Sequence, residues 1–136
     1  FELTGRYKNI IDDSYNSNPV SLNKAIDSFI NIKSQRKKNI IIGDMFELGK
    51  FSKKYHSDAG DYISNINDDI INKIFLIGSY MNYAYSKLKN KNAVYYENIE
   101  KFLENFNKED FISNEFLVKA SNGMNFKKIV SFLKEV

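Results

Sequence analysis

Seven consecutive residues near the amino end of the chain, Asp12 to Asn18 (DDSYNSN), carry side chains that form hydrogen bonds. Carboxylates can accept from ribose hydroxyls, and asparagine amides can match the mixed donor and acceptor edge of a base. The same residue types also build turns, and Asn18 directly before Pro19 is a good helix N-cap. The local sequence leaves a ligand-binding loop and a simple turn about equally open.

A second polar loop, Gly43 to Gly49 (GDMFELG), places the carboxylates of Asp44 and Glu47 between two glycines. His56, the one histidine of the chain, follows shortly afterwards. Such a group could bind a ligand or move a proton. A solvated turn at the end of a strand and a histidine at the edge of the core are the competing interpretations, and local sequence favours them.

A third polar stretch, Lys119 to Gly123 (KASNG), lies near the carboxyl end. A lysine whose aliphatic stem is buried at the end of a strand is well placed to meet an anionic ligand group. Ser121 and Asn122 could instead cap the last helix.

Several common catalytic motifs are absent from the sequence. There is no G-x-x-x-x-G-K-[ST] or G-x-G-x-x-G loop for phosphates, no H-E-x-x-H, no G-x-S-x-G and no cysteine. We therefore expect neither a self-contained catalyst nor a metal site in this chain.

Short β-rich runs alternate with longer segments of helical period along the whole chain. The predicted strands lie at residues 9–12, 38–43, 74–78, 93–96 and 116–118. The predicted helices lie at residues 19–30, 52–66, 80–88, 99–106 and 126–133. Such alternation predicts an α/β three-layer sandwich: a mostly parallel sheet of about five or six strands with helices on both faces. In such folds ligands bind beyond the carboxyl ends of the strands, where all three polar loops fall.

Composition narrows the class of protein further. The 136 residues suit a single domain, 1–136, and 20 basic against 17 acidic residues give a net charge of +3. The basic residues cluster only at Arg36 to Lys38, so we expect no nucleic-acid partner. The apolar runs are far shorter than a membrane span, no signal peptide is visible, and we expect a cytoplasmic protein. Phe1 is not a natural start, so we expect further residues upstream.

The three loops resemble signatures of one enzyme family. Residues 12–19 are similar to the D-D-S-Y-N-A-N-P motif of the Mur ligases, and residues 43–49 with His56 to their G-D-M-x-E-L-G…H stretch. Residues 119–124 resemble K-G-S-R-x-M, and Gly5-Arg6 matches the G-R that opens the third domain of these enzymes. The motifs occur in the family's order over essentially the whole chain.

The resemblance implies a Rossmann-like C-terminal domain, with the family's ATPase and UDP-substrate domains lying outside this sequence. It also implies a reaction: ATP-dependent joining of D-alanyl-D-alanine to a UDP-N-acetylmuramoyl-tripeptide in peptidoglycan precursor synthesis, through an acyl phosphate. ATP and Mg²⁺ would act in the intact enzyme, with the magnesium ligands on the other domains. This domain would pack on the central ATPase domain and close over the ATP site, and we expect a monomer.

The resemblance also implies roles for individual residues, although none is assigned as catalytic. On the nucleotide side, Arg6 would contact the phosphates, Asp13 the ribose, and the remaining residues would line the cleft: Tyr15, Asn16 and Asn18. The residues implied for the dipeptide side are Lys119, Ser121, Asp44, Glu47 and His56. Ala120 and Asn122 replace the Gly and Arg of K-G-S-R, which removes a guanidinium suited to a carboxylate.

Two other functions remain open. Asp12 and Asp13, Ser79 and Lys119 also follow predicted strands in the manner of a phospho-acceptor receiver domain. However, the candidate acceptor Asp44 follows the second strand, where a receiver needs it after the third. The second alternative is a non-catalytic nucleotide-binding module, which would bind ATP measurably as an isolated chain.

Overall fold

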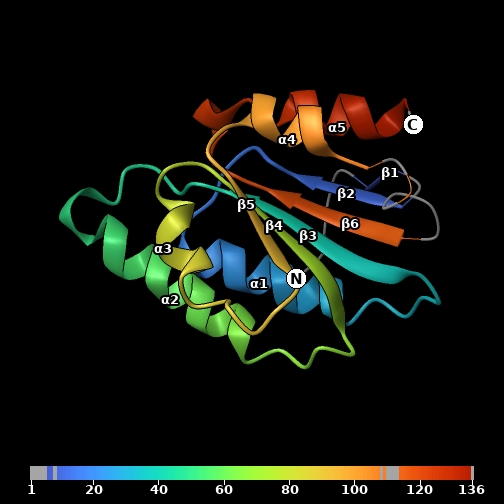
Figure 1. The fold of residues 1–136 in the computed structure, drawn as a ribbon, viewed down its shortest axis with the longest axis horizontal. Coiled ribbons are helices and arrows are strands. Elements are labelled where there is room, and N and C mark those ends of the chain that lie inside the picture. The colour runs from blue at the N-terminus through green and yellow to red at the C-terminus, as the bar shows by residue number, and fades with distance from the viewer. Residues whose placement is uncertain (1–5, 8, 108, 110–113, 136) are drawn as a thin grey trace.

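The computed structural model describes residues 6–7, 9–107, 109 and 114–135. Its sheet has six strands in the order β1-β2-β6-β3-β4-β5 (Figure 1). Their bounds are β1 (Arg6–Tyr7), β2 (Ile10–Asp13), β3 (Lys37–Gly43), β4 (Ile71–Ile77), β5 (Ala93–Tyr96) and β6 (Asn114–Lys119). All neighbouring strands run parallel except β1, which pairs antiparallel with β2.

Helices cover both faces of the sheet (Figure 1). One face packs against α1 (Pro19–Ile30), α2 (Ser52–Ser64) and α3 (Met81–Tyr85). The other packs against α4 (Ile99–Asn105) and α5 (Lys127–Lys134). This arrangement confirms the predicted three-layer α/β fold. No helix within the described part of the chain combines the length and the apolar character needed to cross a lipid bilayer.

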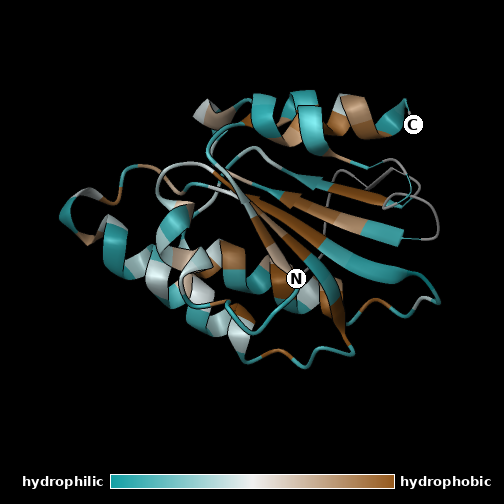
Figure 2. Ribbon diagram, in the orientation of Figure 1, coloured by the Kyte–Doolittle hydropathy of each residue, from teal (hydrophilic) through white to brown (hydrophobic). Residues whose placement is uncertain are grey.

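The central strands are apolar on both sides, which explains why they appear in the sequence as continuous apolar runs. In β3, Ile40 and Ile42 belong to the core beneath α1 and α2, whereas Ile41 between them faces the core beneath α4 and α5. Figure 2 shows the apolar strands at the centre of the fold and polar colour along the outer surfaces of the helices. Burial on both faces holds the carboxyl ends of these strands rigidly side by side.

All five predicted strands and all five predicted helices are present, with some changes of length. The predicted helix 80–88 is shorter, because the chain after Tyr85 continues in turns that bring Leu88 back into the core. β1 was not predicted, since two residues are too short to show a pattern.

The strand order brings three loops together at the carboxyl edge of the sheet. β6 lies between β2 and β3, yet it is followed by α5 on one face while β2 and β3 are followed by α1 and α2 on the other. When two neighbouring strands are followed by helices on opposite faces of the sheet, a crevice forms between the two connections. Ligands bind in this crevice in open α/β sheets. The order also argues against a receiver domain, whose parallel strands would run β3-β2-β4-β5-β6.

Candidate functional site at the carboxyl edge of the sheet

Strand register places Lys119, the last residue of β6, between two of the predicted loops. Lys119 pairs with Asp13 on one side and with Ile42 on the other. The loops after β2, β3 and β6 therefore start at the same level, and their polar residues are brought together as predicted.

The side chain of Lys119 is almost completely buried and points to the first loop. Its ammonium nitrogen lies 3.1 Å from Asp13 Oδ2 and donates to the carbonyl oxygen of Asn16 at 2.7 Å. The Lys119 side chain is 2% exposed, whereas that of Asp13 is 23% exposed. The ion pair thus joins a residue expected on the nucleotide side to one expected on the dipeptide side. Lys119 therefore supports the first loop from its buried side.

The first loop is shaped by its own hydrogen bonds as well. Asp12 Oδ1 accepts from the backbone N–H and the hydroxyl of Ser14. Asn18 caps α1 in a reciprocal capping box with Ser21, so its side-chain oxygen is already used. Tyr15, in contrast, is 75% exposed. Turn formation and ligand access thus fall on different residues of the same loop.

Ser121 links all three loops. Its hydroxyl accepts from the backbone N–H of Phe46 at 2.9 Å and donates to the carbonyl of Ser17 at 3.4 Å. Its own backbone N–H donates to the carbonyl of Asp44 at 3.2 Å. The alternative that Ser121 or Asn122 caps the last helix is wrong, because α5 begins after Phe126 without a side-chain cap.

Asp44 is buried where β3 ends, facing the start of α3. Its Oδ1 accepts from the backbone N–H of Met81 at 2.9 Å. A Cβ on Gly78, whose φ is +119°, would lie 2.4 Å from the same oxygen, so the carboxylate occupies the space of a missing side chain. Burial raises the pKa of Asp44, opposed by backbone hydrogen bonds from Met81 and Tyr80 and by nearby His56. The Asp44 carboxylate is therefore enclosed between the end of β3 and the start of α3.

Glu47 lies in the exposed part of the second loop, where the chain turns. It adopts a left-handed conformation with φ +64°, and Gly49 follows with φ +56°. Before the turn, Phe46 packs against Gly123, where a Cβ would meet its ring at 3.0 Å. Glu47 is therefore the acidic residue of this loop that solvent reaches, whereas Asp44 is enclosed.

His56 is completely buried, so the expectation that it lies at the edge of the core is wrong. Nε2 accepts from the backbone N–H of Met45 at 3.0 Å, and Nδ1 lies 2.6 Å from the carbonyl of Ser52. Both ring nitrogens are therefore engaged by backbone groups of this chain. The residue holds the second loop.

A pocket of 520 Å³ opens beside this cluster, over the ends of β3, β4 and β5. The second loop contributes Asp44 and Phe46, and the start of α5 contributes Lys128. Its other lining residues are Gly78, Ser79, Tyr80, Glu97, Asn98, Ile99, Glu100, Gly123, Met124 and Asn125. Sequence reasoning did not single out Lys128, because a lysine inside a helix gives no signal that the fold brings it to the strand ends.

Arg6 belongs to β1, where its backbone pairs with Ile11. Its side chain and Gly5 lie outside the described residues. Among the residues that are described, no three His, Cys, Asp or Glu side chains converge to hold a metal ion.

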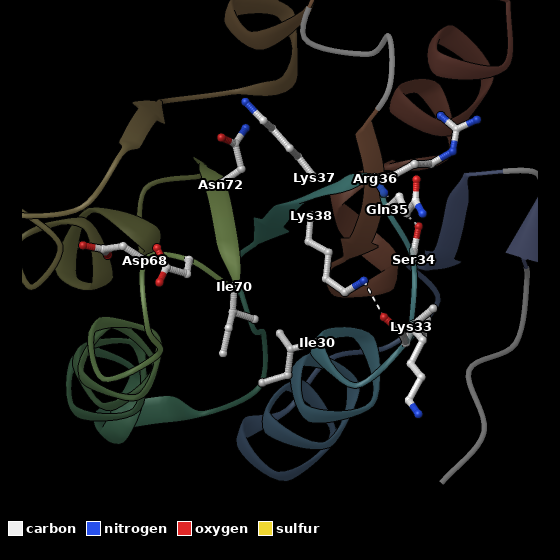
Figure 3. A pocket seen from close by; sticks show the side chains of 12 residues that line it. Ile30, Lys33, Ser34, Gln35, Arg36, Lys37, Lys38, Asp68, Ile70 and Asn72 are labelled. Atoms are coloured by element: carbon white, nitrogen blue, oxygen red, sulfur yellow. Dashed lines mark hydrogen bonds between the residues drawn. The ribbon is translucent and has the colours of Figure 1, made fainter.

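A larger pocket of 640 Å³ lies at the opposite edge, at the amino ends of β3 and β4 (Figure 3). Its charged residues carry both signs: Arg36 directly precedes β3, Lys37 is the first residue of β3, and Asp68 lies before β4. Lys38 is withdrawn from the surface, since its ammonium group donates to the carbonyl of Ile32 and pairs with buried Glu115. The cluster at residues 36–38 is thus not one continuous basic surface.

Comparison with known proteins places the chain among relatives of known architecture. The profile of the family described as "Mur ligase, glutamate ligase domain" matches residues 1–112. The UDP-N-acetylmuramoyl-tripeptide–D-alanyl-D-alanine ligase of Rickettsia prowazekii is 31% identical to this chain over 90% of its length. The ligase of the same name from Bacillus subtilis is 34% identical over 93% of this chain. The chain spans only 27% and 28% of the length of these relatives.

Solved structures share the fold. A crystal structure of MurF from Acinetobacter baumannii superimposes with a TM-score of 0.80 at 23% identity, covering 93% of this chain and 28% of that protein. MurF from Thermotoga maritima, crystallised in complex with ADP, gives a TM-score of 0.66 at 17% identity, covering 96% of this chain and 29% of that protein. With the matched profile covering most of its residues, the chain belongs to the Mur ligase family.

Proposed function

We propose that this chain is the C-terminal domain of an ATP-dependent ligase that joins D-alanyl-D-alanine to a UDP-N-acetylmuramoyl-tripeptide. Relatives with this name match along nearly the whole chain. Because the chain spans about a quarter of their length, the proposed reaction requires the remaining domains of a longer protein. Use of ATP and a UDP-linked substrate implies a cytoplasmic enzyme, and we propose that it acts as a monomer.

In the proposed reaction, the terminal carboxylate of the tripeptide attacks the γ-phosphorus of ATP, which gives an acyl phosphate and ADP. The amine of the dipeptide then attacks the acyl carbon, a proton is lost from nitrogen, and phosphate leaves as the amide forms. The central domain would supply the phosphate loop and the ligands of Mg²⁺. The present domain would contribute by orienting the reactants and excluding water when it closes.

The first loop is the proposed nucleotide side of this domain. Asp13 is partly exposed and ionically paired, so its carboxylate is held in place to accept from the ribose hydroxyls. Exposed Tyr15 and Asn16 would contact the nucleoside, and Asn18 would act indirectly by capping α1. Arg6 keeps its proposed contact with the phosphates. The ADP complex of the Thermotoga maritima relative supports nucleotide binding in this family.

The pocket of 520 Å³ is the proposed dipeptide side. Asp44 and Phe46 line it, Ser121 fixes the backbone of Phe46, and Glu47 stands exposed in the same loop. We assign Lys119 to the support of Asp13 rather than to the dipeptide, because its ammonium group is buried against the first loop.

The observation that carries this proposal is the network of Lys119 and Ser121 at the end of β6. Lys119 holds the first loop, and Ser121 bonds to both the first and the second loop. The proposed nucleotide and amine-donor surfaces are therefore parts of one rigid unit. A domain of this kind can bring both reactants into place by a single closing motion.

ADP release from ATP tests the proposal. The full-length protein should release ADP only when both the UDP-linked tripeptide and D-alanyl-D-alanine are present, and the isolated 136-residue chain should release none. Robust ATP hydrolysis by the isolated chain would contradict the domain assignment. Tight ATP binding by that chain, without ligase activity in the full-length protein, would favour a non-catalytic nucleotide-binding module.

A further inference from the structure

The hydrogen bonds of His56 define its protonation state. A carbonyl oxygen can only accept, so the 2.6 Å contact with Ser52 requires a proton on Nδ1. A backbone N–H can only donate, so the 3.0 Å bond from Met45 requires a bare Nε2. The arrangement is compatible only with the neutral Nδ1–H form of the ring. Because the chain has a single histidine, this state can be observed without ambiguity.

His56 is one of three attachments that fix the start of the second loop. Asp44 is bonded to the start of α3, Met45 to His56 on α2, and Phe46 to Ser121 after β6. Three consecutive residues are thus held by three different elements. Asp44 and Phe46 line the pocket of 520 Å³, and the bond to His56 fixes the buried residue between them.

The ring of His56 also contacts a second residue that lines the pocket, Tyr80. Its centroid lies 5.2 Å from that of Tyr80, which lines the pocket at the end of β4. A change in the position or charge of the ring would therefore affect the second loop through Met45 and the pocket lining through Tyr80.

We propose that His56 is a positioning residue whose neutral Nδ1–H ring holds the second loop in the shape that receives the amine donor, and that a proton on Nε2 releases this loop. The kinetic part of this inference rests on the proposed function, whereas the structural part does not.

Protonation would place an N–H of the ring against the N–H of Met45, and two donors cannot bond to each other. The charged group facing the ring is Asp44, which favours the cation, and the aromatic ring of Tyr80 packs beside it. Burial lowers the pKa of His56, opposed by the bond to Ser52 and by Asp44. The loop is therefore held at neutral pH and loosens as the pH falls below about 6.5 toward the lowered pKa.

Nuclear magnetic resonance on the 136-residue chain tests the structural part. Long-range ¹H–¹⁵N spectra at pH 7 should show a protonated Nδ1 and an unprotonated Nε2. On acidification, the Met45 amide should shift together with the titrating ring. A ring protonated on Nε2 at pH 7, or a Met45 amide that does not follow the ring, would overturn the inference.

Kinetics of the full-length protein test the functional part. His56→Gln keeps an acceptor for Met45 but cannot titrate in this range, so it should retain most activity and lose the acid limb of kcat/KM for D-alanyl-D-alanine. His56→Ala should lower kcat/KM for the dipeptide about tenfold, the effect of losing one orienting hydrogen bond. The KM for ATP should change less than twofold, roughly the error of such assays.

Ile63→Val is the matched control, because it weakens the buried face of the same helix without touching the loop. It should leave both kinetic parameters and the pH profile unchanged. Equal effects of His56→Ala and Ile63→Val, or an acid limb that persists in His56→Gln, would refute the positioning role. If the wild-type protein forms no amide product, the proposed function fails while the resonance experiment still decides the state of His56.

Discussion

The ammonium group of Lys119 lies 3.1 Å from the carboxylate of Asp13, across two neighbouring parallel strands. The pair is asymmetric, since Lys119 is buried while Asp13 reaches the surface of the crevice. Under the proposed function, Lys119 would hold the Asp13 carboxylate in place for the nucleotide and would not contact a ligand itself. A mutation of Lys119 is therefore expected to affect the nucleotide side more than the dipeptide side.

We predict that Lys119→Met raises the KM for ATP more than the KM for D-alanyl-D-alanine in the full-length protein. Methionine preserves the buried stem but leaves Asp13 and the carbonyl of Asn16 without their cation. Steady-state kinetics with each substrate varied in turn check this. Lys127→Met, at an exposed position of α5, is the control. A larger effect on the dipeptide would return Lys119 to the dipeptide side.

Ser121→Ala should destabilise the isolated chain by about 1–2 kcal/mol, because the N–H of Phe46 loses its acceptor when the buried hydroxyl of Ser121 is removed. Urea unfolding measures the difference. Ser64→Ala, which removes an exposed hydroxyl bonded to Asp61, should cost less than about 0.5 kcal/mol. Similar costs at the two positions would mean that Ser121 does not join the loops.

Asp44→Asn should be at least as stable as the wild type at pH 7. The amide oxygen can still accept from Met81, and no buried charge has to form. Since the pKa of Asp44 is raised from 3.8, its contribution to stability is complete below that pH and is lost as the pH rises through the raised value. Between about pH 4 and pH 7 the unfolding free energy of the wild type should therefore fall relative to that of Asp44→Asn. A shift in favour of the wild type would show that the carboxylate is stabilised by its site.

Gly78→Ala should destabilise the chain by about 2 kcal/mol or more. Alanine is strained at the φ of +119° that Gly78 adopts, and its Cβ would collide with the carboxylate of Asp44. Gly49→Ala offers a control with a positive φ and no atom within 4 Å of the added Cβ. It should cost only about 1 kcal/mol. Thermal unfolding of both variants separates the collision from the backbone strain, and equal losses would argue against close packing of Asp44 on Gly78.

Sequence patterns predicted the fold well because the strands and helices are locally consistent. The run at Ile40 to Ile42 and the helical stripe of α1 both follow from burial, and the polar loops then had to meet at one edge. The order of the strands could not be predicted from the sequence patterns, because the insertion of β6 between β2 and β3 depends on which face each helix covers.

Local sequence was weakest for polar residues that the fold buries. Lys119 and His56 carry side chains that are typical of a ligand site. In the fold, however, Lys119 is bound by Asp13 and the carbonyl of Asn16, and His56 by backbone groups of Met45 and Ser52. The periodicity of a sequence does not show which backbone carbonyl or N–H group will lie next to a buried polar side chain. Lys128 is the opposite case: its position inside a helix does not suggest a site, yet it lines the pocket of 520 Å³.

The product of the reaction tests the central claim most directly. Mass spectrometry of the full-length protein incubated with ATP, the UDP-linked tripeptide and D-alanyl-D-alanine should detect a UDP-linked pentapeptide, formed with one ADP per amide bond. The product should disappear when the dipeptide is left out. Absence of that pentapeptide under conditions where an established ligase of the family forms it would contradict the account.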